Sequence, residues 1–91
     1  MKDIEEITQE LLKFRNERDW EQFHTPKNLA MAITGEAGEL AAEFQWLTAQ
    51  QSELAALSVE QLEAISLEIA DVQIYLLRLA DVLNVDIPAA V

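Results

Sequence analysis

The sequence has no cysteine, only two glycines and two prolines, and six basic residues against seventeen acidic ones. Without cysteine there is no disulfide and no thiolate metal ligand, so cysteine usage leaves the compartment open. The scarcity of glycine and proline argues against a loop-rich chain, and abundant Ala, Leu, Glu and Gln favour helix. Neither an amino-terminal apolar run nor a stretch of about 18 apolar residues is present, so we expect a cytoplasmic protein.

The formal net charge is −11. Nucleic-acid backbones and anionic membrane surfaces attract positive charge, so we expect neither as a partner. The charge is compatible with binding cations. An anionic substrate is compatible with it too, provided that a metal ion bridges the two sets of negative charge.

The chain has 91 residues, of which 51% are hydrophobic. We expect one domain over residues 1–91, because a chain of this length has no room for a second. Such a small domain buries a limited core, which oligomerisation can complete. The predicted fold is therefore an all-α helical bundle with long antiparallel helices, completed by homo-oligomerisation.

Helix-start signals divide the chain into segments. Asp3 is a candidate N-cap for a helix over about 3–18. Thr25 and Pro26 suit the N-cap and first position of a second helix over about 26–49. A loop with a short helical turn is expected over about 49–58.

A third helix is expected to begin after Ser58, which forms a capping-box pattern with Gln61. The NVDIP segment at 84–88 ends this helix, and Asp86 with Pro88 can start another turn. Apolar residues of the third helix alternate spacings of three and four, as in a helix–helix seam: Leu62, Ile65, Ile69, Val72, Leu76, Leu79 and Leu83. A second apolar line comprises Leu67, Ala70, Ile74 and Leu77. A helix that is apolar on two sides needs neighbours on both, within the bundle and from a partner subunit.

Two acidic pairs stand beside the apolar sides of the second and third helices. Glu36 and Glu39 are three residues apart, as are Glu68 and Asp71, so each pair shares a helix face. Glu43 continues the first stripe. If the apolar faces pack antiparallel, these acids meet across the helix pair, and crowded carboxylates need protons or a cation. Oxygen ligands without His or Cys select Mg²⁺, Mn²⁺ or Ca²⁺.

Two other interpretations apply to the acids. Acidic pairs at this spacing are common on solvated helix faces without any metal. A di-iron bundle requires Glu-x-x-His motifs, and the single histidine, His24, lies in an expected loop outside such a motif.

Residues 17–46, ERDWEQFHTPKNLAMAITGEAGELAAEFQW, followed by LEIADVQIYLLRLADVLNVDIPAAV at 67–91, resemble the MazG-like all-α nucleoside triphosphate pyrophosphatases. The resemblance is strongest to the dCTP pyrophosphatase branch. It implies that Glu36, Glu39, Glu68 and Asp71 bind Mg²⁺, with Mn²⁺ as a possible substitute. It further implies a homo-oligomer, a dimer or a dimer of dimers, that cleaves a (deoxy)nucleoside triphosphate to the monophosphate and pyrophosphate, in a nucleotide house-cleaning role.

The resemblance also implies an aromatic base pocket, which carries over to Trp20, Trp46 and Tyr75; by themselves, these aromatics are as well suited to a core or an interface. Within the metal cluster, Glu39 is our candidate to orient or deprotonate the attacking water. Arg15 and Lys27 are candidates for phosphate contact, with solvated charge as the alternative. Arg78 lies on the acidic-stripe side and can pair with an acid.

The sequence departs from the family pattern at two places. Leu11 stands where the dCTP pyrophosphatase branch has a pocket histidine, which puts cytosine preference in doubt. The family also continues with a segment containing Lys, Asn and an Arg/Lys-Tyr-Pro stretch, and this sequence ends at Val91 without it. The rival to an enzyme is a non-enzymatic acidic helical interaction module that works through the apolar seam of the third helix.

Overall fold

A computed structural model describes residues 2–18 and 25–91. Within these ranges four α-helices follow one another: α1 (Ile4–Arg18), α2 (Pro26–Ala42), α3 (Val59–Val82) and the short α4 (Ile87–Ala90). A 3-10 turn, η2 (Leu54–Ala56), lies between α2 and α3. No strand occurs in the described ranges, so the predicted all-α class is confirmed.

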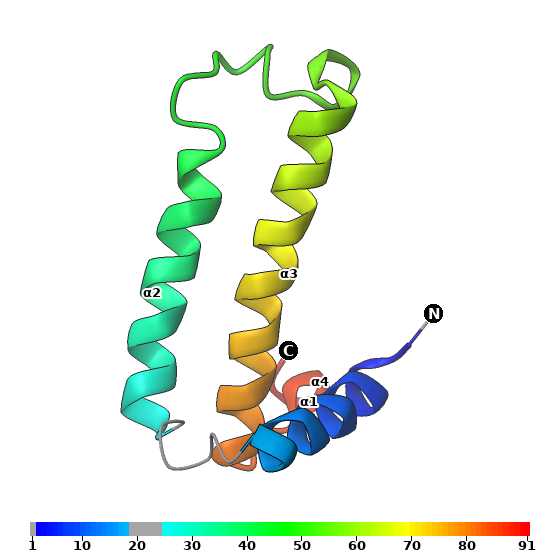
Figure 1. Ribbon diagram of the computed structural model, residues 1–91, viewed down its shortest axis with the longest axis vertical. Helices are drawn as coiled ribbons and strands as arrows, with labels where there is room; N and C mark the ends of the chain where they lie inside the picture. Colours follow the sequence, from blue (N-terminus) through cyan, green and yellow to red (C-terminus); the bar gives the residue numbers. More distant parts are fainter. Residues whose placement is uncertain (1, 19–24) are drawn as a thin grey trace.

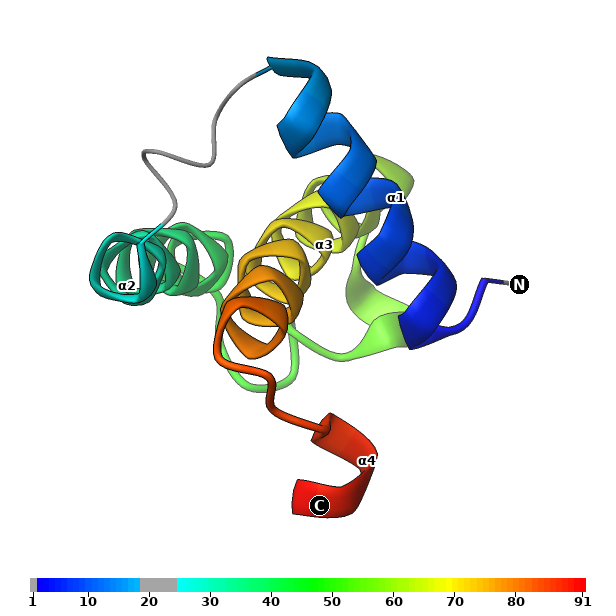
Figure 2. The ribbon, with the colours of Figure 1, turned by 90° about the horizontal axis from the view of Figure 1, so that it is seen from below.

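The long helices α2 and α3 run antiparallel and side by side (Figure 1). Helix α1 crosses the carboxyl-terminal part of α3 and contacts it, and α4 lies near α1 (Figures 1 and 2). Helix α3 has 24 residues, which corresponds to a length of about 36 Å. Helices α1 and α2 both contact α3, so α3 is the central helix of the fold.

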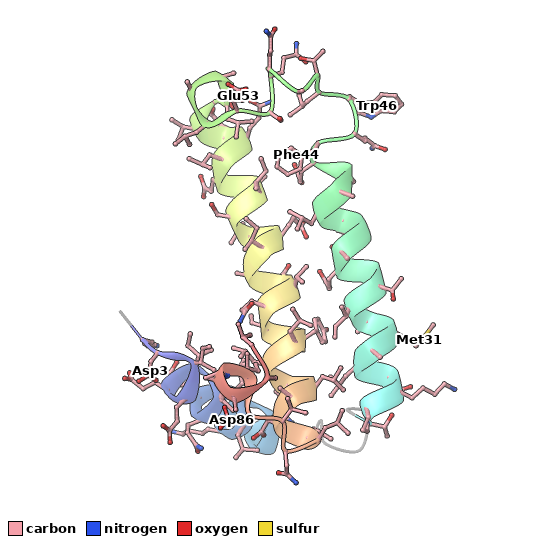
Figure 3. All side chains as sticks on the ribbon, turned by 180° about the vertical axis from the view of Figure 1, so that it is seen from behind. Asp3, Met31, Phe44, Trp46, Glu53 and Asp86 are labelled. Carbon is pink, nitrogen blue, oxygen red and sulfur yellow. The ribbon has the colours of Figure 1, made fainter. Side chains whose placement is uncertain are left out.

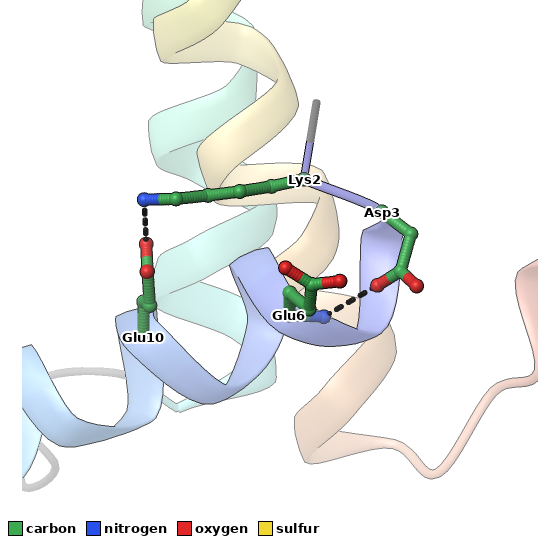
Figure 4. Close-up of polar contacts among 4 residues, drawn as sticks. All are labelled: Lys2, Asp3, Glu6 and Glu10. Carbon is green, nitrogen blue, oxygen red and sulfur yellow. Dashed lines mark hydrogen bonds and ion pairs between the residues drawn. The ribbon is translucent and has the colours of Figure 1, made fainter.

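The predicted helix starts are confirmed by their capping hydrogen bonds. The Glu6 amide donates to Asp3 Oδ1 at 2.8 Å, next to a surface ion pair between Lys2 and Glu10 (Figure 4). The Asn28 amide donates to Thr25 Oγ1 at 3.2 Å at the start of α2. Each cap satisfies a backbone donor that has no partner within its own helix.

Helix α3 begins and ends as its sequence indicates. The Gln61 amide donates to Ser58 Oγ at 3.0 Å and the Ser58 amide donates to Gln61 Oε1 at 2.8 Å, which completes the predicted capping box. At the other end Asn84 takes a left-handed conformation with φ 56°. The Val85 amide then donates to the carbonyl of Ala80 at 2.8 Å, a bond typical of a helix terminated by a left-handed residue.

The predicted second helix is too long, because α2 ends at Ala42 and not near residue 49. Beyond it the Glu43 and Phe44 amides donate to carbonyls three residues back, which tightens the chain into turns. Thr48 and Gln51 then exchange side-chain hydrogen bonds, with Thr48 N to Gln51 Oε1 at 2.9 Å and Gln51 N to Thr48 Oγ1 at 3.2 Å. These local bonds compete with continuation of the helix.

The core of the isolated chain is small. Among described residues, Leu29, Ile65 and Leu77 are the buried hydrophobic side chains. The radius of gyration is 15.3 Å, whereas a compact chain of this length has about 12 Å. The predicted seam of α3 divides accordingly: Ile65 is buried and Val72 and Leu79 are half-buried, but four seam residues remain exposed, namely Leu62, Ile69, Leu76 and Leu83.

Candidate metal site

The antiparallel packing of α2 and α3 brings the acidic pairs together. Glu36, Glu39 and Glu68 each offer a carboxylate oxygen, and these three atoms lie within 4.8 Å of one another. Two oxygens on opposite sides of one Mg²⁺ ion are separated by about 4.2 Å, since each bond is about 2.1 Å long. Small side-chain rotations would therefore let all three carboxylates bind one ion.

Two of these carboxylates are partly buried and incompletely satisfied. Glu36 and Glu68 are half-buried, and the Oε2 atom of each is buried without a hydrogen-bond partner. Glu39 is exposed. Buried polar atoms are normally hydrogen-bonded or bound to an ion. Two carboxylates that converge from two helices, each with an unpartnered oxygen, fit a cation held between them.

The electrostatics of the site are unfavourable when all its acids are ionised. Burial, followed by the charges of Glu39, Asp71 and Glu68, raises the pKa of Glu36 above its ordinary value of 4.5. Burial, followed by the charges of Glu39, Asp71 and Glu43, likewise raises the pKa of Glu68. A bound cation would favour the ionised forms and oppose both shifts.

Asp71 stands beside this group of three without being part of it. It is half-buried, and its charge contributes to the raised pKa of both Glu36 and Glu68. Of the four predicted metal ligands, three are thus gathered and the fourth is close enough to act on two of them. Glu43, which the sequence placed on the acidic stripe outside the paired motif, also acts on Glu68.

The predicted substrate-binding residues are dispersed in the isolated chain. Trp46 is 86% exposed after the end of α2 and points away from the helix pair, whereas the nearby Phe44 is half-buried (Figure 3). Tyr75 is half-buried on α3, one turn beyond Asp71, and Lys27 is exposed in the first turn of α2. Trp20 lies outside the described residues, as does the side chain of Arg15 on α1; both assignments stay predictions.

Sequence reasoning missed the burial of Arg78. Its side chain is 3% exposed, and Nη1 donates to Asp81 Oδ2 at 2.9 Å. The spacing of three residues between a basic and an acidic residue signals the ion pair. Nothing in the apolar pattern indicates that the guanidinium itself is enclosed.

Comparisons with known proteins show that the chain is similar to pyrophosphatases. No family model matches it. Human dCTP pyrophosphatase 1 is 56% identical over 45 residues, which are 50% of this chain and 26% of the human protein. The bovine protein of that name is 56% identical over 43 residues, or 47% and 25% of the two chains. The chain thus matches about a quarter of the length of these curated relatives.

A solved structure extends the likeness over almost the whole chain. A pyrophosphatase from Archaeoglobus fulgidus superposes with a TM-score of 0.86 at 40% identity, covering 99% of this chain and 82% of the archaeal one. An all-helical fold shared over almost the whole chain at this level of identity defines the class as an all-α pyrophosphatase fold. The chain belongs to the MazG-like nucleoside triphosphate pyrophosphatase family.

Proposed function

We propose that this chain is a Mg²⁺-dependent pyrophosphohydrolase that cleaves nucleoside triphosphates, with deoxynucleotides as the preferred class, and that it removes unwanted members of the dNTP pool. The observation that carries the proposal is the group of three carboxylates with two buried, unpartnered oxygens. The names of its relatives support the reaction class. In this proposal residues 1–91 form one catalytic domain.

Glu36, Glu39 and Glu68 would hold the divalent ion, with Asp71 as a further ligand on α3. Mn²⁺ has the same preference for oxygen ligands and is the expected substitute. When bound, such an ion neutralises phosphate charge and lowers the pKa of an attacking water. Glu36 and Glu68 are half-buried and would anchor the site between the helices, and the exposed Glu39 would be accessible to substrate and water.

The proposed reaction divides the triphosphate between its α- and β-phosphates. The water oxygen forms a bond to the α-phosphorus while the bond from that phosphorus to the bridging oxygen breaks. Pyrophosphate leaves with the bridging oxygen, and Glu39 accepts the proton that the water loses. The products are the nucleoside monophosphate and pyrophosphate.

The remaining predicted contacts are part of the same proposal. Trp20, Trp46 and Tyr75 would line the base pocket, and Lys27 and Arg15 would contact phosphates. Trp46 is largely exposed in the isolated chain. Its role therefore requires a second surface to close over it, which a second copy of the chain would supply.

A homo-oligomer is the expected working form. The chain exposes 6802 Å², whereas a compact monomer of 10.3 kDa exposes about 5,400 Å². The excess of about 1,400 Å² is larger than the roughly 800 Å² that each partner buries in a standard interface. The exposed seam residues of α3 form a line repeated every seven residues, which suits a second helix: Leu62, Ile69, Leu76 and Leu83.

We place the protein in the cytoplasm, with neither nucleic acid nor membrane as a partner. The net charge of −11 supports this assignment. No helix in the described part of the chain is long and apolar enough to cross a bilayer.

Pyrophosphate release from a panel of dNTPs with Mg²⁺ tests the function. Glu39→Gln should lower turnover by about 100-fold or more, because it removes the proposed base and one metal ligand. Glu63→Gln is the matched control, since Glu63 is an exposed acid of α3 outside the cluster. Full turnover in Glu39→Gln would refute the site assignment.

The exposed apolar line of α3 also favours the second candidate, a non-enzymatic interaction module. The two candidates differ in thermal melts. The enzyme predicts a stability increase with Mg²⁺ and a further increase with particular dNTPs, whereas the module predicts melting that is indifferent to both.

A further inference from the structure

Arg78 is the buried charge of the described chain, with 2% of its surface exposed. It follows the buried Leu77, which lines one pocket together with Ile4 and Thr8 of α1. Its guanidinium has one described partner, the carboxylate of Asp81 at 2.9 Å from Nη1. The Nε and Nη2 atoms are buried, and no described residue accepts a hydrogen bond from either.

These two atoms form one edge of the guanidinium. Their N–H groups are parallel, and this edge binds two oxygens of one carboxylate or phosphate at once. A buried donor without an acceptor is costly, and a buried charge with one partial partner is more so. The unpartnered Nε–Nη2 edge therefore has the geometry to bind an oxyanion, and binding one would satisfy two buried donors.

The position of Arg78 on α3 relates this edge to the metal site. Arg78 follows Asp71 by seven residues, so the two lie almost in line on the helix, two turns and about 10 Å apart. Side chains on a helix lean toward its amino terminus, which for Arg78 is the direction of Asp71. In the free chain the guanidinium instead contacts Asp81, three residues toward the carboxyl end. Arg78 is also the one basic residue in the sequence of α3, and Lys27 is the one in α2.

We propose that Arg78 binds a phosphate group of the nucleotide through its Nε–Nη2 edge and retains the same contact to the pyrophosphate product. The inference rests on the proposed function and adds a positive contact that the acids themselves do not provide. In the free chain the edge is covered, so binding requires the long side chain to rotate toward the metal site. This rotation gives up the Nη1 bond to Asp81 at 2.9 Å and gains two hydrogen bonds through the edge, which has no described partner in the free chain.

Inorganic pyrophosphate is the probe, titrated with Mg²⁺ present into the full chain and followed by calorimetry. Arg78→Lys and Arg78→Gln should both weaken pyrophosphate binding by roughly 10- to 100-fold, because lysine keeps the charge but lacks the two-donor edge. Mg²⁺ affinity should not change. Lys2→Gln is the control for losing one positive charge, since Lys2 pairs at the surface with Glu10.

The wild-type chain gives a second measurement, which does not depend on how the variants fold. The chain has three arginines, and the Nε–H signal of Arg78 in ¹⁵N NMR should shift on adding pyrophosphate with Mg²⁺. Unchanged pyrophosphate affinity in folded Arg78 variants, or an unmoved Arg78 signal, would overturn the inference. Arg78 variants that change only the oligomeric state would also overturn the inference. The Nε–Nη2 edge would then bind a carboxylate of a second copy of the chain.

The outcomes separate this inference from the proposed function. If the wild type cleaves dNTPs but binds pyrophosphate independently of Arg78, the inference fails and the function stands. If the wild type releases no pyrophosphate from any dNTP yet binds it through Arg78, the phosphate site stands and the hydrolase proposal fails.

Discussion

Glu36 on α2 and Glu68 on α3 converge across the antiparallel pair, and each buries an oxygen that has no hydrogen-bond partner. The two residues are 32 positions apart in the sequence. Burial raises the pKa of both carboxyl groups, and the neighbouring acids add to the shift. Binding of the proposed ion would therefore couple to fold stability at this point, because the same ionisation that costs the metal-free fold free energy creates the ligands for a cation.

The first prediction concerns the pH dependence of the metal-free protein. Between the ordinary pKa of 4.5 and the raised folded pKa, the folded state holds protons that the unfolded state has released. The contribution of Glu36 and Glu68 to the free energy of unfolding is thus greatest below pH 4.5 and is lost as pH rises through the folded pKa. With a chelator present, we expect Tm to fall over this range, and saturating Mg²⁺ should reverse the trend.

General repulsion in a chain of net charge −11 also lowers stability as pH rises. The Glu36→Gln/Glu68→Gln double variant separates the two effects. It should show a flatter fall of Tm with pH in chelator and no response to Mg²⁺. A double variant with the same pH profile and the same Mg²⁺ response as the wild type would contradict the coupling.

The second prediction concerns the start of α3. Ser58→Ala removes an acceptor for the Gln61 amide at 3.0 Å, so the free energy of unfolding should fall by about 1 kcal/mol. For a domain of this size that is a decrease in Tm of about 4–8 °C. Ser66→Ala is the control, because Ser66 Oγ donates to the Leu62 carbonyl within the helix and caps nothing. Equal melting of both variants would show that the capping box contributes no stability.

The local features of the fold could be predicted from the sequence, because each depends on a few adjacent residues. Asp3, Thr25 and Ser58 were identified as caps from their chemistry and spacing, and each makes the expected bond. The end of α2 was misplaced because apolar residues continue beyond Ala42 with helical spacing. The chain turns at Glu43 and Phe44, whose amides bond three residues back, and the reciprocal bonds of Thr48 and Gln51 then keep the helix from resuming. The hydrophobic pattern signals neither.

The site could be predicted only in part. The i, i+3 spacing identified the acids, and antiparallel packing was sufficient to bring Glu36, Glu39 and Glu68 together. Which acids converge most closely depends on how α2 and α3 are aligned along their length. That alignment follows from side-chain packing between the helices, which the spacing of the acids in the sequence does not specify. The enclosure of Arg78 likewise cannot be read from the local pattern, because a basic residue within an apolar helix is usually expected to reach solvent.

The third prediction concerns the glycines beside the acids on α2. Neither Gly35 nor Gly38 has a positive φ, and a Cβ added at either would meet no atom within 4 Å. Gly38→Ala should therefore raise the free energy of unfolding by about 0.5–1 kcal/mol through reduced freedom of the unfolded chain. Ala37→Gly on the same helix should lower it by a similar amount, measured by chemical denaturation. A loss of stability in Gly38→Ala would mean that another surface covers this face of α2.

The fourth prediction concerns the exposed line of α3. Ile69 is 54% exposed in the isolated chain, and the surface that the chain exposes in excess of a compact monomer points to a missing neighbour. Ile69→Lys places a charge in the proposed helix–helix interface, where burial without a partner is costly. We expect the molar mass from light scattering to fall toward that of the monomer, with the helical circular dichroism retained.

Met31→Lys is the matched control for that experiment. Met31 is 64% exposed on α2 and points away from α3, so the same exchange of an apolar side chain for a charge leaves the α3 line intact (Figure 3). Its molar mass should equal that of the wild type. If Ile69→Lys also retains the wild-type mass, the second copy does not dock on this line. If both variants dissociate, the interface includes the outer side of α2, where Gly38→Ala should then prove destabilising as well.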